Sequence, residues 1–410
     1  MNRRVVITGM GAVTPIGIGL EEFWQALLEG RNGVAPITLF DASEYPSRIA
    51  AEVKDWDPSQ YMEKKKIKAL SRCAQFGVTA AKLCMENANW EQAEEDSKQA
   101  VVGSMSNSAH DVLEHLVETV THKGYKRISP RTLPMVIPHT STSEVAAMAG
   151  FQGTVLSITN ACAAGVYATG HAAQLIRSGK FDAILCPATD ASITPSGLSC
   201  FCRAGLVSER NAEPHKASRP FDAERDGGVL GEGGTCLLLE SEEHAQRRSA
   251  SMYAEVVGFG SHEAYGGNNE HEDYKGMYDS MSKALISANC HPESVDYIGC
   301  NGVSDEMLDR IETEAVKKLF KENAYTTPIS SVKGQIGIPL NVAGTTQLIS
   351  SVLALTRGVI PATQNYEVPD PECDLDYVPN TPRKNQLSRV LVHSHGLNGS
   401  NASLLLQTML

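Results

Sequence analysis

A cysteine at a predicted strand-to-helix corner is the residue best placed to do chemistry. An apolar run, Thr154–Ile158, ends shortly before Cys162, and small residues at 163–165 lead into a helical pattern that reaches Ser178. A cysteine at a helix N-terminus feels the positive end of the helix dipole, which favours the thiolate. Its backbone N–H can also face a developing oxyanion. A single cysteine is more often a buried packing residue, so the surrounding pattern decides between the two interpretations.

Alternating strand and helix patterns must position this cysteine. Buried strands are predicted from continuous apolar runs at Arg4–Thr8, Ala100–Gly103, Ala183–Cys186 and Gly234–Glu240, with helical patterns between them. Such alternation is typical of an α/β protein whose sheets are covered on both faces.

The second half of the chain repeats the plan of the first. Tyr253–Gly260 opens it much as Arg4–Gly11 opens the first half, and the polar stretch Ser241–Ser249 separates the two. The repeat predicts a duplication, with one half at residues 1–250 and the other at residues 251–410.

The composition of the chain limits the classes of function that it could have. The chain has 410 residues and a net charge of −12, so no nucleic-acid partner is expected. Most of the ten cysteines stand in apolar surroundings, as reduced cysteines of cytosolic proteins do. Cys200-Phe-Cys202 lacks a second pair at zinc spacing, so no metal site is expected. No apolar run is long enough for a signal peptide or a membrane span, and the expected location is the cytoplasm.

Several segments of the chain, taken in order, carry a family resemblance. They are Val5–Pro15, Arg127–Pro130, the Cys162 corner, Ala217–Asp222, Glu224–Gly233, Asp309–Glu314 and Pro371–Pro379. These segments resemble the β-ketoacyl-ACP synthases of the ketosynthase II type. The resemblance spans essentially the whole chain and implies a thiolase fold, a duplicated α/β architecture of five layers, α-β-α-β-α. It also implies that Cys162 takes an acyl group from acyl carrier protein, whose phosphopantetheine arm delivers the substrate, with no other cofactor.

Both histidines that the family uses for condensation are replaced. The family's His-Gly-Thr-x-Thr motif matches Asn301 to Asp305, which places Asn301 at the first histidine. The Lys-x-x-x-Gly-His motif matches Lys333 to Ile338, which places Ile338 at the second. Asparagine cannot act as an acid or base near neutral pH, and isoleucine has no polar group. General acid–base and oxyanion contributions are each worth roughly two to four orders of magnitude, so we expect only a trace of malonyl condensation.

The resemblance assigns roles to further residues near Cys162. His395 takes the gate position, where it is either a substitute catalytic histidine or a polar plug, and Leu397 supplies the second oxyanion N–H. Asn398 replaces a glycine of the same loop, and asparagine tolerates the positive φ that the loop requires.

Other family positions concern packing and substrate binding. Lys333 and Glu312 match a buried ion pair, for which a structural role is expected because an unpaired buried charge is costly. Val303 and Asp305 replace the two threonines that line the phosphopantetheine tunnel. Ile137 lies in the family's dimer-interface segment and is expected to project toward the partner's tunnel.

Basic residues form two groups in this acidic chain, the first at Lys64, Lys65 and Lys68 and the second at Lys126 and Arg127. Most runs of charge are only solvated faces, but acyl carrier protein is acidic and would be steered by positive charge. Arg72 follows the first group closely in the sequence. The resemblance places carrier-protein docking at Lys64, Lys65, Lys68, Lys126 and Arg127.

Three functions compete. The first is a subunit like a chain length factor, which pairs with an active ketosynthase in type II polyketide, polyene or fatty-acid-like biosynthesis and shapes the acyl tunnel. Chain length factors commonly carry glutamine where this chain keeps Cys162. The second is a non-elongating ketosynthase or acyltransferase that uses Cys162 as the acyl acceptor. The third is a self-sufficient condensing enzyme that uses His395 and Asn301. The expected partners are acyl carrier protein and either an active ketosynthase or a second copy of the chain.

Overall fold

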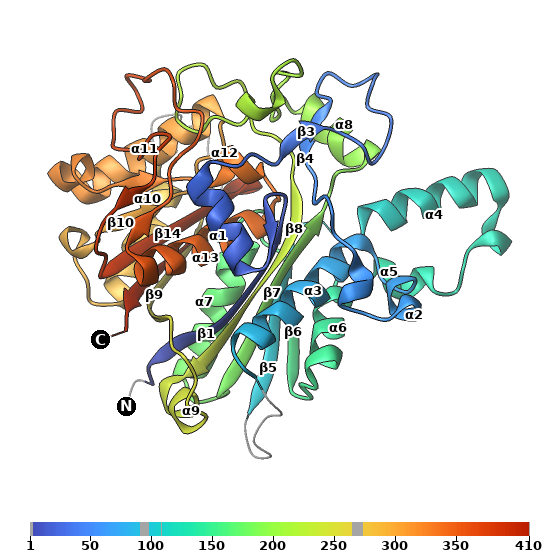
Figure 1. Cartoon of the computed structure of the whole chain (residues 1–410), viewed down its shortest axis with the longest axis horizontal. Coiled ribbons are helices and arrows are strands. Elements are labelled where there is room, and N and C mark those ends of the chain that lie inside the picture. The colour runs from blue at the N-terminus through green and yellow to red at the C-terminus, as the bar shows by residue number, and fades with distance from the viewer. Residues whose placement is uncertain (1–2, 91–97, 108, 265–273, 410) are drawn as a thin grey trace.

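Two halves with the same strand order build the protein (Figure 1). The computed structural model describes residues 3–90, 98–107, 109–264 and 274–409. The first half contains β1 (Val5–Thr14), β5 (Gln99–Met105), β6 (Thr154–Ile158), β7 (Ala183–Ala191) and β8 (Glu232–Ser241). The second contains β9 (Ala254–Glu263), β10 (Tyr297–Gly299), β11 (Ile329–Ser330), β14 (Arg389–Gly396) and β15 (Ser400–Thr408).

The strand order confirms the duplication expected from the sequence. The first half is ordered β6-β5-β7-β8-β1 and the second β11-β10-β14-β15-β9, so each half places its own five strands in the order 3-2-4-5-1. The second strand of each half along the chain, β5 or β10, pairs in parallel with both of its neighbours in the sheet. The remaining pairs within each half are antiparallel. Val6 pairs with Glu255 and Ile7 with Ala254, which joins the halves through β1 and β9.

Two helices lie between the sheets of the two halves, and others cover the outer faces. The central helices are α7 (Ala164–Arg177) and α13 (Asn341–Arg357), and every residue of α13 from Asn341 to Leu355 is buried. They cross closely because Gly165 has no side chain: a Cβ there would lie 2.7 Å from the Asn341 carbonyl oxygen. The main core surrounds this pair. With the outer helices the order is α-β-α-β-α, which confirms the thiolase fold. The outer helices are α3 (Arg72–Asn87), α6 (Thr140–Ala149), α10 (Lys275–Ser287) and α11 (Glu306–Phe320).

An arm extends from the body beside the edge of the sheet, at the right of Figure 1. It consists of α4 (His110–Lys123), a 3-10 turn at Tyr125–Arg127 and α5 (Thr132–Val136). Val117, Tyr125 and Leu133 are 63%, 74% and 69% exposed on it. The edge strand β6 pairs only with β5 among the described strands, and its first three residues are exposed. An open edge and exposed apolar side chains mark a surface that another chain would cover.

Shorter elements complete the fold. None of the helices in the described ranges is long and apolar enough to cross a membrane. The shorter helices are α1 (Leu20–Glu29), α2 (Lys64–Ile67), α8 (Pro195–Arg203), α9 (Glu242–Arg247) and α12 (Lys333–Ile336). The shorter strands are β2 (Gly17–Ile18), β3 (Val34–Pro36), β4 (Ile49–Ala51), β12 (Val359–Ile360) and β13 (Arg383–Lys384).

Candidate active site

Cys162 stands at a strained corner two residues before α7, as the sequence predicted. Ala161 has a φ of 46°, a conformation that side-chain-bearing residues rarely adopt and that marks functional sites. The Ser106 hydroxyl donates to the Ala161 carbonyl oxygen at 2.8 Å and fixes the corner from the end of β5. The corner therefore presents Cys162 at the start of the central helix.

The turn after β14 covers the cysteine and supplies a second N–H. Gly396 packs so closely that a Cβ there would lie 2.9 Å from the Cys162 nitrogen, and the Ser394 hydroxyl donates to the Cys162 carbonyl oxygen at 3.2 Å. The backbone N–H groups of Leu397 and Cys162 lie close enough to the thiol to lower its pKa. Asn398 adopts a φ of 66°, as expected for its glycine-like position. Two N–H donors thus converge where the oxyanion of a thioester would form.

The thiol itself is not activated, which corrects the sequence expectation of a thiolate. Burial and the nearby Asp190 carboxylate raise the pKa of Cys162 to about 11, although Lys333 and the two N–H groups act in the opposite direction. The partly buried Phe201 and Ile338 pack with Cys162 against one small apolar cluster. Because desolvation disfavours the charged form, burial outweighs the two N–H groups and Lys333.

Asn301 is held at both its backbone and its side chain. Glu312 accepts hydrogen bonds from the backbone N–H of Asn301 at 2.6 Å and of Gly302 at 2.7 Å. The Lys333 ammonium donates to the Asn301 carbonyl oxygen and, at 3.4 Å, to its Oδ1. The backbone N–H of His395 donates to the same Oδ1 at 3.2 Å. Asn301 therefore sits between the lysine and the strand that touches Cys162.

Lys333 and Glu312 are both 2% exposed. Glu312 accepts from the Asn301 N–H and Lys333 donates to the Asn301 carbonyl oxygen. Asn301 therefore lies between the two charged groups of the expected ion pair. Burial lowers the pKa of Lys333 and raises that of Glu312 to about 7, because each charged form loses its hydration.

Ile338, which the resemblance places at the second histidine position, has only a hydrocarbon side chain. Its backbone pairs with the 229–231 segment, through an N–H donated to the Val229 carbonyl oxygen at 2.6 Å. Its side chain packs against Gly228, where a Cβ would lie 2.1 Å from Ile338 Cδ1. Nothing at this position can donate or accept a proton.

His395 is tied to the loop it belongs to. Its Nδ1 lies 3.0 Å from Asn401 Oδ1, and burial lowers its pKa, so the ring is neutral at physiological pH. The neighbouring His393, which the sequence analysis did not single out, is fully buried, and burial lowers its pKa to about 3. Its Nε2 is buried without a partner in the described chain. Neither ring is a charged acid.

A buried carboxylate next to the corner was also missed. Asp190, at the end of β7, is fully buried, and desolvation raises its pKa to about 6. It accepts hydrogen bonds from the Ser192 hydroxyl at 2.5 Å, the Asn341 amide at 3.1 Å and the Ser106 N–H at 3.2 Å. Asp190 thus ties β7 and α13 to the residue that clamps Ala161. One Asp after an apolar strand carries no sequence signal that would have revealed this.

Val303 and Asp305, at the two predicted tunnel positions, make hydrogen bonds within the fold. Val303 is buried, and its N–H donates to Asp309 Oδ1 at 2.8 Å. Asp305 caps α11, because its carboxylate accepts from the N–H groups of Met307 at 3.1 Å and Leu308 at 2.9 Å. Ile137 follows the last residue of α5 and is half-buried. An assigned pantetheine contact at these positions remains a prediction.

The basic residues lie in two groups, one at α2 and one on the arm. Lys64, Lys65 and Lys68 are exposed on and after α2, and Lys126 and Arg127 are exposed at the outer turn of the arm. Two neighbouring cations, Lys66 and Arg72, form ion pairs within the chain. Lys66 pairs with Glu144, and Arg72 binds the buried Glu232 at 2.5 Å.

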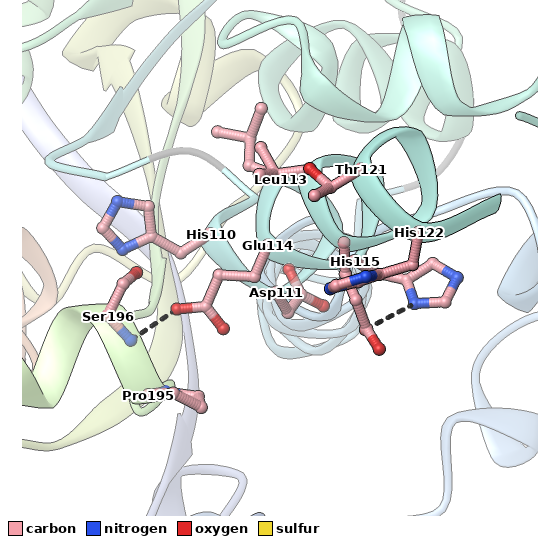
Figure 2. A pocket seen from close by; sticks show the side chains of 11 residues that line it. His110, Asp111, Leu113, Glu114, His115, Thr121, His122, Pro195 and Ser196 are labelled. Atoms are coloured by element: carbon pink, nitrogen blue, oxygen red, sulfur yellow. Dashed lines mark hydrogen bonds and ion pairs between the residues drawn. The ribbon is translucent and has the colours of Figure 1, made fainter. Parts of the chain in front are cut away.

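A cavity of about 870 Å³ lies between α4 and α8 (Figure 2). Leu113 and Val117 line it among polar residues, and Glu114 accepts from the Ser196 N–H at 2.6 Å. The same α8 carries Phe201, which packs near Cys162. No group of three or more metal-ligating side chains occurs among the described residues. The remaining lining residues are His110, Asp111, His115, Glu118, Thr121, His122 and Pro195.

Known proteins are similar to this chain over nearly its whole length. Profiles of the β-ketoacyl synthase N-terminal and C-terminal domains match residues 2–245 and 253–367. The chain is 39% identical over 406 residues to a 3-oxoacyl-[acyl-carrier-protein] synthase 2 of Coxiella burnetii, covering 98% of both chains. It is 36% identical to the tetracenomycin polyketide synthase ketoacyl synthase alpha subunit of Streptomyces glaucescens, over 98% of this chain and 97% of that one.

Solved structures agree over the full length. The ishigamide ketosynthase/chain length factor superposes with a TM-score of 0.91 at 29% identity, covering 100% of both chains. A structure described as a type II PKS acyl-carrier protein in complex with its ketosynthase bound to the hexaketide gives a TM-score of 0.92 at 30% identity, again covering 100% of both. Together with the fold and the cysteine corner, these matches show that the chain belongs to the β-ketoacyl synthase family.

Proposed function

We propose that this chain is a chain-length-factor-like subunit that pairs with an active ketosynthase and shapes the tunnel in which an acyl chain grows. The observation that carries the proposal is the pair Asn301 and Ile338. Neither residue can move a proton near neutral pH, and the thiol of Cys162 has a pKa of about 11. The family scaffold is complete, whereas the groups that drive malonyl decarboxylation are missing.

The exposed surfaces support a partner of the same fold. Among the described strands β6 has one unpaired edge, where Val155 and Leu156 are exposed, and the arm beside it exposes Val117 and Leu133. A related chain that added its own edge strand would continue the sheet and cover the arm. The cavity between α4 and α8 belongs to the same arm, so it would contribute its wall to a tunnel at the subunit boundary.

Acyl carrier protein is the proposed source of the substrate. A structural relative is described as a complex of a ketosynthase with its acyl-carrier protein. Here the exposed Lys64, Lys65, Lys68, Lys126 and Arg127 would attract an acidic carrier. Docking on these residues should weaken steeply with salt.

Co-purification tests the pairing. The chain is expressed with a ketosynthase encoded beside it, and a stable 1:1 complex is expected. A matched variant with Leu156→Lys places a charge on the open edge and should reduce complex formation without unfolding the chain. The proposed pairing would be contradicted if the chain does not bind the ketosynthase, or if the Leu156→Lys variant forms the complex as well as the parent does.

A second function is favoured by the intact oxyanion donors. The N–H groups of Leu397 and Cys162 still converge on the thiol, and thiol transacylation needs a nucleophile and an oxyanion hole but no decarboxylation. Intact mass after incubation with an acyl-carrier protein distinguishes the two functions. An acyl adduct that Cys162→Ala abolishes, formed within minutes near pH 8, would favour the acyltransferase.

A further inference from the structure

The cavity between α4 and α8 has carboxylates on its wall but no cation. Asp111, Glu114 and Glu118 line it, and no lysine or arginine is among the described residues that do so (Figure 2). Glu114 accepts one hydrogen bond, from the Ser196 N–H at 2.6 Å. Glu118 is 65% exposed and lies 3.9 Å from His115 Nδ1. The wall is therefore rich in acceptors that the chain itself leaves largely unused.

Two buried atoms on this wall have no hydrogen-bond partner. They are Asp111 Oδ1 and His110 Nδ1, which are closed to solvent and lack a donor or acceptor within reach in the described part of the chain. Most buried polar atoms in proteins are paired. Arg72 is attracted by Asp111 at a distance, but its guanidinium binds Glu232 at 2.5 Å. The free carboxylate oxygen therefore indicates a donor that comes from outside the chain.

The position of the cavity shows what would cover it. Leu113 and Val117 line it beside the carboxylates, and Val117 is 63% exposed. The arm that carries α4 extends beside the edge of the sheet, so a chain that paired with β6 would also reach α4 (Figure 1). Covering carboxylates removes their hydration, which is unfavourable unless a cation or a hydrogen-bond donor replaces the water. An acyl chain alone offers neither.

We propose that the cavity between α4 and α8 binds lysine or arginine side chains of the partner ketosynthase. The inference rests on the proposed pairing and adds the chemistry that the partner must present there. The partner's cations would pair with Glu114 and Glu118 and donate a hydrogen bond to Asp111 Oδ1. A second copy of this chain fits less well, because it also carries a net charge of −12 and long-range repulsion opposes self-pairing.

Removing two of the charges tests the proposal. Glu114→Gln keeps an oxygen for the Ser196 N–H, and Glu118→Gln changes an exposed side chain. The double variant and the parent are each co-purified with the ketosynthase, and sedimentation over a dilution series at pH 8 gives the dissociation constant. At low salt the double variant should bind about tenfold more weakly, as expected for two lost ion pairs. Salt should weaken the parent complex steeply and the variant complex much less, because salt screens charge pairs.

A matched control separates local from overall charge. Glu293→Gln with Glu322→Gln removes the same two charges from exposed turns of the second half and should keep the parent's affinity and salt dependence. Thermal unfolding checks that every variant is folded.

The outcomes distinguish this inference from the pairing on which it rests. Parent-like affinity in the Glu114→Gln, Glu118→Gln variant, or weaker binding with the parent's salt dependence, would overturn the inference and leave the pairing standing. Self-association of the chain alone that the same two substitutions weaken would assign the cavity to a second copy and also overturn it. A parent chain that does not bind the ketosynthase would refute the pairing itself, and the inference with it.

Discussion

Removing the charge of Asp190 should make Cys162 more reactive, not less. Asp190 raises the pKa of the Cys162 thiol, second only to burial. Asp190→Asn keeps an oxygen for the N–H groups of Ser106 and Asn341 and an amide for Ser192, so the corner should keep its shape. The substitution therefore isolates the electrostatic contribution of one buried carboxylate.

The expected size follows from the charge and the medium. A unit charge acting over about 10 Å at an effective dielectric constant of about 20 contributes about 1.7 kcal/mol, slightly more than one pH unit. Since the thiolate is the nucleophile, alkylation of Cys162 near pH 8 should accelerate about tenfold. The parent thiol, with a pKa near 11 against an ordinary 9.0, should react about a hundredfold more slowly than an unperturbed cysteine.

The assay is iodoacetamide labelling resolved by peptide mass, with the exposed Cys200 as an internal reference. The pKa of Asp190 is about 6, so the parent carboxyl is protonated below that pH. The ratio of variant to parent rates should therefore be largest at pH 8 and approach one near pH 5. A parent rate that levels off below pH 9, or an Asp190→Asn rate that falls, would refute the reasoning.

Three further predictions concern stability, the corner and assembly. Although burial raises it, hydrogen bonds from Arg248 and His244 hold the pKa of Glu240 below its ordinary value. Its stabilisation is therefore present above the unfolded-state pKa and lost as pH falls through the folded-state value, and Glu240→Gln should cost roughly 2–4 kcal/mol in urea unfolding at pH 7. Gly396→Val should distort the Cys162 corner, because a Cβ there would lie 2.9 Å from the Cys162 nitrogen, and should change the rate at which iodoacetamide labels Cys162, whereas an unchanged labelling rate would show that the turn can move. Val155→Lys on β6 should shift the assembled protein toward monomer in analytical ultracentrifugation, and an unchanged sedimentation profile would place the interface elsewhere.

Much of the fold was predictable because the signals were local. The apolar runs and the break near residue 250 predicted alternating elements and duplication, and the shared strand order bears this out. The corner at Cys162 was predictable from small residues that follow a strand. The family motifs, anchored on both sides, predict that Asn301 and Ile338 replace the two histidines.

Properties that depend on contacts between residues far apart in the sequence were not predictable. The raised pKa of Cys162 depends on burial and on Asp190, which the fold brings together from separate segments. Arg72 looked like a surface cation beside a lysine run, but its partner Glu232 lies 160 residues away and draws it inward. The orientation of the Asn301 amide likewise depends on two donors from other elements.

The central claim is that this chain supports condensation by a partner without supplying the nucleophile. It is tested most directly by product yield and chain length from the reconstituted pair with malonyl-loaded acyl carrier protein, comparing two single substitutions. Cys162→Ala in this chain should leave yield within about twofold and chain length unchanged, whereas cysteine-to-alanine substitution at the partner ketosynthase's nucleophile should abolish product. Loss of product with Cys162→Ala would contradict the account and favour an acyl-transfer role for this cysteine.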